Sequence, residues 1–157
     1  MKKMNNKGFS LVELIVVVLI MAIIAVALAP QVMRWVENSR KSNDIEAYAS
    51  LVNALQVAGT DEGVLSEVGT STITVTFDKA TGVSMTGNKL IAAVIRTLPE
   101  LGTSAGALNS AGMKVQGDWS GTNCMDTDNK FKITVKKSAD GSGLVVEQTF
   151  KPKKVFS

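Results

Sequence analysis

The residues that most often carry enzyme chemistry are scarce in this chain of 157 residues. Histidine, the commonest acid–base group and metal ligand, is absent. The single cysteine, Cys124, cannot form a disulfide within the chain, and no histidine is present to activate it as a nucleophile. Gly141 and Gly143 lack the third glycine and the context of a nucleotide-binding motif. The sequence therefore predicts no catalytic residue and no cofactor, with Cys124 as a small buried hydrophobe or a loop thiol.

One short acidic stretch, Asp126-Thr127-Asp128-Asn129, begins like a calcium-binding loop. The next ligand position is Lys130, and neither the glycine nor the closing glutamate of such a loop follows. We therefore expect a turn at this position and no metal site.

One carboxylate stands in an unusual place. Glu13 is the only charged residue in 9–29, an otherwise apolar run that would span about 30 Å as a helix, the thickness of a bilayer's hydrocarbon core. A carboxylate at that depth costs on the order of 3 kcal/mol, so it normally has a partner or a purpose. Since no lysine or arginine lies within the run, Glu13 is either protonated there or paired with another molecule.

Three lysines precede the apolar run and predict a cytoplasmic N-terminus with an exported C-terminal portion. Lys2, Lys3 and Lys7 also account for the whole formal net charge of +3, because 17 basic residues less these three equal the 14 acidic ones. The basic isoelectric point is therefore no argument for nucleic-acid binding.

The apolar run also allows two simpler interpretations. A secretory signal peptide is favoured by Ala27-Leu28-Ala29, which fits a small-x-small cleavage pattern. Against it, the run exceeds the usual length of about 7–15 residues, contains a glutamate, and would place Pro30 directly after the cut. A plain single-pass anchor fits the length and leaves Glu13 unexplained.

The run Lys7-Gly8-Phe9-Ser10-Leu11-Val12-Glu13, followed by the apolar helix and Pro30, resembles the signature of type IV prepilins. The similarity lies in a short basic leader, a glycine before a phenylalanine, and a glutamate four residues beyond that phenylalanine. It covers roughly the first 30 residues, and the remaining hundred carry no motif that we can match.

The resemblance implies that a membrane-embedded aspartyl peptidase cuts between Gly8 and Phe9, and that the new amino group on Phe9 is methylated. It also implies that Glu13 pairs with the Phe9 amine of a neighbouring subunit during assembly. Each of these charges alone would cost several kcal/mol on burial, and pairing offsets much of that cost. A protonated Glu13 that faces lipid is the alternative. Pro30 is expected to kink or locally melt the helix.

Behind the apolar run, the helix is expected to continue over 30–58 as an amphipathic segment that enters a globular head, with Gly59 as its C-cap. Residues 37–44 are polar all round, so we expect them to face solvent. The following apolar stripe at helical spacing comprises Ile45, Tyr48, Ala49, Val52 and Leu55.

The fold class expected for the whole chain is α+β: a leader over 1–8, a transmembrane or filament-core helix over 9–29, the amphipathic segment, and a head over 59–157. Alternating residues predict strands in the head, and a second helix begins at an Asn88 cap. The antiparallel sheet should hold about four strands: Ser71–Phe77, a weaker one at Met113–Trp119, Phe131–Lys137, and Leu144–Phe150 after a turn at 140–143.

Charge is unevenly distributed along the chain. Residues 37–78 carry seven acidic and two basic side chains, and 130–157 carry seven basic and two acidic ones. Opposite poles of this kind can meet across an interface between subunits. Two solvated faces, or pairing within the monomer, explain the pattern equally well. The tail Lys151-Pro152-Lys153-Lys154 would suit DNA or an anionic surface, as would any solvated terminus.

With the resemblance, the expected function is that of a type IV pilin, which polymerises through its N-terminal helix into an extracellular filament for adhesion, motility or DNA uptake. The implied partners are copies of itself, the prepilin peptidase and methylase, an inner-membrane assembly platform, a separate ATPase and minor pilins. Before assembly the precursor would cross the cell membrane once. A pseudopilin of a type II secretion or competence apparatus shares the signature, although the calcium loop of some secretion pseudopilins is not convincing here. A membrane-anchored enzyme or sensor is the third alternative.

Overall fold

The computed structural model describes residues 10–119 and 130–148. The chain divides into two compact units, Met1–Glu37 and Asn38–Ser157, and the long helix α1 (Leu11–Ala58) contributes to both. Several predicted features lie outside the described residues: Gly8, Phe9, Cys124, the stretch 126–129 and the basic tail 151–154.

The first unit consists of the N-terminal part of α1. No glycine occurs between Gly8 and Gly59, so nothing in this stretch lowers helix propensity as glycine would. All residues from Ser10 to Val36 are exposed, including their long run of large apolar side chains. The helix continues through Pro30 without interruption, and a kink at this residue stays a prediction.

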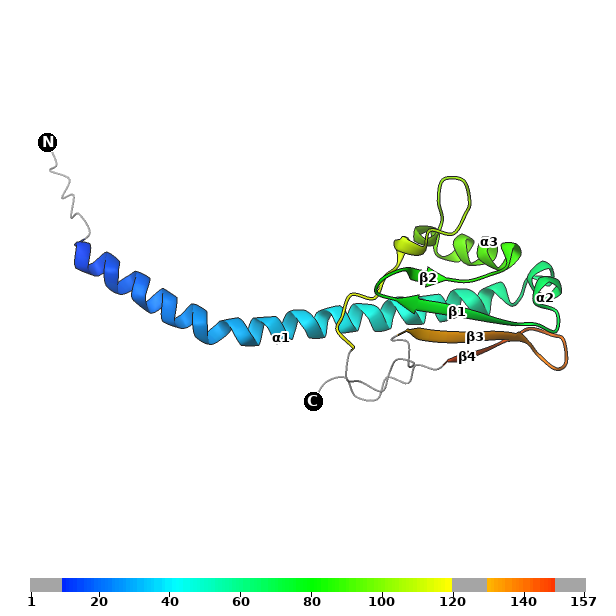
Figure 1. The fold of residues 1–157 in the computed structure, drawn as a ribbon, viewed down its shortest axis with the longest axis horizontal. Helices are drawn as coiled ribbons and strands as arrows, with labels where there is room; N and C mark the ends of the chain where they lie inside the picture. Colours follow the sequence, from blue (N-terminus) through cyan, green and yellow to red (C-terminus); the bar gives the residue numbers. More distant parts are fainter. Residues whose placement is uncertain (1–9, 120–129, 149–157) are drawn as a thin grey trace, which may run out of the picture. The chain divides into compact units, whose positions relative to one another are not determined.

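The second unit is built on a four-stranded antiparallel sheet in the order β2-β1-β3-β4 (Figure 1). The two central strands pair through six residues each, with Val75 opposite Ile133. The α+β class and the four-stranded antiparallel sheet are therefore confirmed. The strands are β1 (Thr72–Asp78), β2 (Gly82–Ser84), β3 (Phe131–Lys137) and β4 (Leu144–Gln148).

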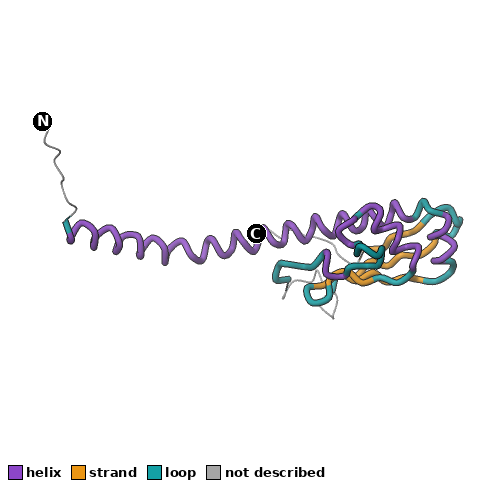
Figure 2. Tube along the Cα trace, turned by 90° about the horizontal axis from the view of Figure 1, so that it is seen from above, coloured by secondary structure: helices purple, strands orange, loops and turns teal. Residues whose placement is uncertain are grey.

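The core lies between one face of this sheet and the second part of α1 (Figure 2). The alternation in the sequence is reproduced, because Ile73, Val75 and Phe77 of β1 are buried while the threonines between them are exposed or half-buried. An aromatic cluster surrounds Phe131, whose ring centroid lies 5.4 Å from Trp119 and 5.8 Å from both Tyr48 and Phe77. The buried residues that α1 contributes are Asp44, Tyr48, Leu51, Val52, Ala54, Leu55 and Ala58.

Two shorter helices complete the second unit. The helix α2 (Glu62–Val68) was not predicted from the sequence. Its N-cap is Asp61, whose Oδ1 accepts a hydrogen bond of 2.8 Å from the Gly63 amide. The predicted second helix is α3 (Asn88–Thr97), but Asn88 is not its cap. Gly87 occupies that position with φ of 103°, and the cap is supplied from α2 instead.

The cap of α3 is the side chain of Glu67. Its Oε2 accepts hydrogen bonds from the backbone amides of Lys89 at 2.9 Å and Leu90 at 3.0 Å. A Cβ atom on Gly87 would lie 2.8 Å from that same oxygen, so a glycine is needed for both its backbone conformation and the space it leaves. The prediction of an Asn88 cap is therefore wrong, because a carboxylate distant in sequence takes over its role.

The prediction of a strand at Met113–Trp119 is also wrong. This segment is irregular and follows two short 3₁₀ turns, η1 (Pro99–Leu101) and η2 (Ser110–Gly112). The fourth strand is β2, which pairs with β1 through three residues. Gly82 of β2 has φ of 80°, and a Cβ atom there would lie only 1.8 Å from the Ser110 carbonyl oxygen. The close approach of η2 to β2 therefore requires glycine at this position.

Candidate functional site

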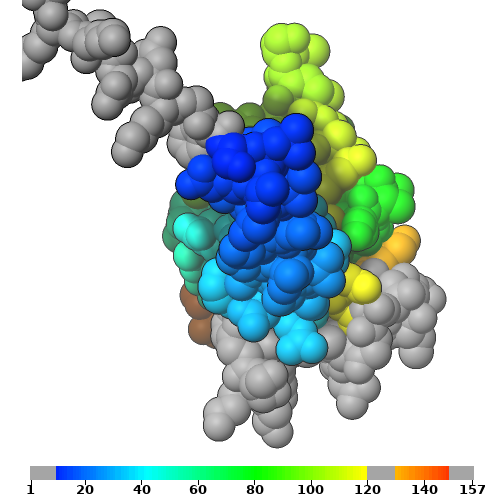
Figure 3. All heavy atoms as spheres, turned by 90° about the vertical axis from the view of Figure 1, so that its left-hand side faces the viewer, coloured from blue at the N-terminus to red at the C-terminus, as the bar shows by residue number. Residues whose placement is uncertain are grey.

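The N-terminal part of α1 carries the features that the sequence analysis singled out. The Ser10 carbonyl accepts a hydrogen bond of 3.1 Å from the Leu14 amide, and Glu13 lies in the first turn of the helix. A carboxylate in that turn is stabilised by the partial positive charge of the helix N-terminus. The apolar side chains that follow are exposed around the helix, drawn in blue in Figure 3.

Glu13 makes no ion pair with any residue in the part of the chain that the structure describes. The next charged residue along the helix is Arg34, 21 positions further on (34 − 13). Phe9, the proposed source of a pairing amine, lies outside the described residues. Over residues 10–29 the helix therefore carries a single carboxylate among exposed apolar side chains, and such a group suits a cation supplied by another molecule.

A second carboxylate on α1 has the opposite surroundings. Asp44 is only 2% exposed, and its two oxygens accept three hydrogen bonds from the segment before residue 120. The Gln116 amide donates to Oδ1 at 2.7 Å, while the Gly117 amide and Trp119 Nε1 each donate to Oδ2 at 2.8 Å. We refer to these four residues as the Asp44 clasp. It corrects the prediction that all of 37–44 faces solvent.

The Asp44 clasp is closely packed. A Cβ atom on Gly117 would lie 2.9 Å from Asp44 Oδ2 and 2.8 Å from Lys41 Cγ. The Lys41 ammonium lies 5.6 Å from the centre of the Trp119 ring, within the range of a cation–π contact. A signal for the clasp was present in the sequence: Asp44 precedes Tyr48 by four residues and Leu55 by eleven, so it shares the buried face of α1.

Several acidic residues of the 37–78 region are paired within the monomer. Asp61 forms an ion pair with Arg96 at 3.1 Å, and the nearly buried Asp78 lies 3.7 Å from Lys130. Asp44 and Glu67 also accept hydrogen bonds from residues of their own chain. For these four, pairing within the monomer accounts for the charge pattern without an interface.

The pKa values of these carboxyls reflect the same contacts. The hydrogen bond from the Gly63 amide, aided by Arg96, holds the pKa of Asp61 below its ordinary value. Burial raises the pKa of Asp78, but hydrogen bonds from Thr81 and Ala80 and the charge of Lys130 outweigh that effect and lower it. In the β3–β4 turn, hydrogen bonds led by the Ser138 side chain lower the pKa of Asp140 to about 2. All three carboxylates are therefore structural anions at neutral pH.

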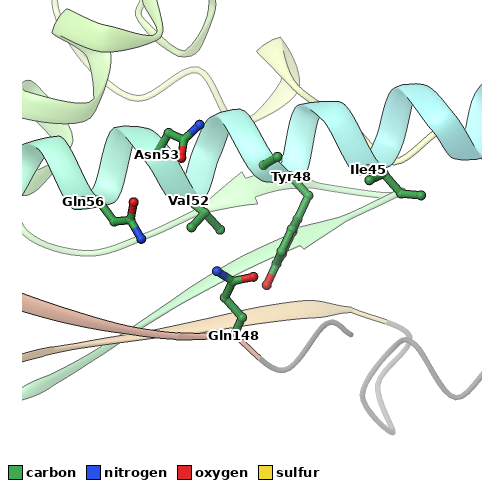
Figure 4. Close-up of a pocket in the computed structure, with 7 residues that line it drawn as sticks. Ile45, Tyr48, Val52, Asn53, Gln56 and Gln148 are labelled. Atoms are coloured by element: carbon green, nitrogen blue, oxygen red, sulfur yellow. The ribbon is translucent and has the colours of Figure 1, made fainter. Parts of the chain in front are cut away.

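Two grooves open on the second unit. One of about 250 Å³ lies between α1 and the edge strand β4 and is lined by Tyr48, Val52 and Gln148 among others (Figure 4). The other, of about 300 Å³, lies between α1 and α3 and contains the Asp61–Arg96 pair. Among the described residues, no group of three or more histidine, cysteine, aspartate or glutamate side chains could hold a metal ion.

Comparison with known proteins adds one match. Residues 3–29 match the family model of the prokaryotic N-terminal methylation motif, which is the leader signature of type IV prepilins. Neither a curated protein nor a solved structure matches the chain. By length and composition alone, α1 could cross a membrane, and it is the only such helix in the described part of the chain.

The motif and the apolar helix together indicate a class of protein. This is an α+β protein with a long apolar N-terminal helix, and that helix begins within a prepilin-type segment. The motif supports a type IV pilin or a pseudopilin, both of which are structural subunits rather than enzymes, and it implies processing by a prepilin peptidase. A membrane-anchored precursor fits the same features.

Proposed function

We propose that this chain is the structural subunit of a type IV pilus, and that it polymerises through the N-terminal part of α1. The observation that carries the proposal is Glu13, an isolated carboxylate on an exposed apolar helix, placed within residues 3–29 of the motif. Cleavage between Gly8 and Phe9 would create an amine four residues before Glu13. On a neighbouring subunit this amine is a cation for Glu13, which forms no ion pair with any described residue of its own chain.

The assembly step follows from these groups. The Phe9 amine of an incoming subunit pairs with Glu13 of its neighbour, so that two charges that are costly to bury alone are neutralised together. Burial of the apolar side chains then stabilises the filament by about 1.5–3 kcal/mol for each large one. The second unit is left to form the filament surface, on which adhesion, motility or DNA uptake depends.

The proposed partners are the proteins that processing and assembly of the precursor require. The precursor crosses the membrane once with its leader in the cytoplasm, and the prepilin peptidase and methylase act on Gly8 and Phe9. An inner-membrane assembly platform, a separate ATPase and minor pilins would build the filament.

The first experiment is mass spectrometry of the N-terminus in material sheared from cells. A chain that begins at N-methylated Phe9 in a sedimentable extracellular filament supports the pilus subunit. The same processed chain retained at the cell envelope, without sheared filaments, would favour a pseudopilin. An uncut Met1, or a chain that begins at Pro30, would overturn both.

Glu13→Ala tests the assembly role. We expect cleavage after Gly8 to proceed and the yield of sheared filaments to fall at least tenfold, because the amine of the incoming subunit loses its counter-charge. The matched control is Glu100→Ala, which removes an exposed carboxylate from η1 of the second unit. A normal filament yield from Glu13→Ala would remove the ion-pair argument.

A further inference from the structure

The apolar surface of the first unit does not end at Pro30. Trp35 is 69% exposed, and Val32 and Val36 are 48% and 45% exposed. Together with Leu28, these residues are spaced at i, i+4, i+7 and i+8, so they form one face of α1, which we call the Trp35 face. Arg34 and Glu37 lie on the opposite side of the helix by the same spacing.

We propose that the Trp35 face binds the lipid headgroup layer on the exported side of the membrane while the precursor is held there. This inference rests on the membrane-held precursor of the proposed function.

The length of the helix places this face at the membrane surface. From Leu11 to Pro30 the helix contains 20 residues and spans about 30 Å, which matches the hydrocarbon core. Val32–Val36 then lies about 3–9 Å beyond that core, within the headgroup region. The change in pattern agrees, since the helix is apolar all round before Pro30, apart from Glu13, and amphipathic after it.

The chemistry of the side chains fits the same layer. An indole ring has a large apolar body and one N–H donor, and tryptophan is enriched at membrane–water interfaces for that reason. Arg34 can extend its charged end toward phosphates or water while its methylenes stay near the acyl chains. Packing of the Trp35 face against a second copy in a dry interface would bury the indole N–H without a partner supplied by water or lipid. The lipid surface is therefore the better occupant.

The test uses the two tryptophans of the chain. The full precursor is inserted into vesicles of phosphatidylcholine and phosphatidylglycerol whose acyl chains carry bromine at shallow, middle or deep positions. The fluorescence of Trp35 is obtained by subtracting the emission of the Trp35→Phe chain from that of the unaltered chain. The Trp35→Phe chain keeps Trp119 and its hydrogen bond to Asp44. The test therefore leaves all four residues of the Asp44 clasp unaltered.

We expect shallow bromines to quench Trp35 at least twofold more than deep ones. Stronger quenching of Trp35 by deep bromines than by shallow ones would overturn the inference. So would a Trp35 that no bromine quenches and that acrylamide quenches fully from the aqueous phase. Quenching that disappears as the protein-to-lipid ratio rises would show that a second copy covers the face, and would also overturn it.

A second reporter separates this inference from the proposed function. In the Trp35→Phe chain, Val18→Trp places an indole near the centre of the apolar run. If deep bromines quench that reporter while Trp35 is not quenched by shallow ones, the helix spans the membrane and only the Trp35 inference fails. If the Val18 reporter is not quenched by deep bromines, the membrane-held precursor fails with it.

Discussion

At the scale of single residues, two carboxylates on α1 illustrate how surroundings assign a role. Glu13 lies on an exposed apolar helix, and within the described residues it has no ion-pair partner. Asp44 is buried, and both of its oxygens are satisfied by donors from residues 116–119. The first therefore suits an interaction between molecules, and the second holds an irregular segment against its own helix.

Asp44→Asn tests the second role. All three partners of Asp44 are N–H donors, so an amide nitrogen in place of one oxygen would face a donor and leave it unsatisfied. We expect the free energy of unfolding to fall by about 1–3 kcal/mol. The measurement is guanidinium unfolding of the full chain in mild detergent, followed by the fluorescence of Trp119 with Trp35→Phe present in both chains.

The control for Asp44→Asn is Glu46→Gln, which makes the same kind of change at an exposed site two residues along the same helix. It should alter stability by less than about 0.5 kcal/mol. Equal effects of the two substitutions would mean that the clasp contributes nothing to the stability of the second unit.

At the scale of elements, the sequence predicted the helices and strands whose apolar residues recur at a regular spacing. The alternation in β1 and β3 and the length of α1 all appear in the structure. The wrong predictions concern segments whose structure depends on long-range contacts. The pattern of Met113–Trp119 predicted a strand, but the Gln116 and Gly117 amides donate hydrogen bonds to Asp44 and not to a neighbouring strand. The short β2 depends on the contact between Gly82 and η2, and no local pattern indicates it. Within the candidate site, the roles of Glu13 and Pro30 stay predictions, and the Asp44 clasp was not predicted.

The Glu67 cap of α3 gives a prediction at this scale. Burial raises the pKa of Glu67, but the Leu90, Lys89 and Asn88 amides outweigh it, so the pKa lies below its ordinary value of 4.5. A carboxyl with a lowered pKa stabilises the fold above the unfolded-state pKa, and loses that contribution as the pH falls through the folded-state value. We expect Glu67→Ala to cost about 0.5–2 kcal/mol at pH 7, as loss of a cap does.

The pH dependence checks this assignment. In urea unfolding, the difference between the unaltered chain and Glu67→Ala should be constant between pH 7 and about pH 5, and should shrink below about pH 4.5. Glu62→Ala, which removes an exposed carboxylate from α2, is the comparison. A stability difference for Glu67→Ala that persists unchanged to pH 2 would show that packing, and not the charged cap, is responsible.

At the scale of the whole molecule, α1 serves two purposes along one helix. Every buried residue of the hydrophobic core lies in the second unit, and no residue from Ser10 to Val36 contributes to it. The first unit can therefore meet the requirements of a membrane or a filament without affecting the fold of the second. The second unit, by contrast, depends on the α1 residues from Asp44 onward.

This division predicts different outcomes for two truncations. A chain that begins at Asn38 keeps the whole core and should fold as a soluble monomer, whereas a chain that begins at Gly59 should not fold. The second truncation removes Tyr48, Leu51, Val52 and Leu55, whose burial stabilises the fold by about 6–12 kcal/mol in total. That sum is comparable to the entire stability of a typical domain, about 5–15 kcal/mol. Circular dichroism, thermal unfolding and size-exclusion chromatography would distinguish the two chains. Unfolding of the chain from Asn38 would mean that the apolar half of α1 supports the second unit, and the proposed separation of roles would be wrong.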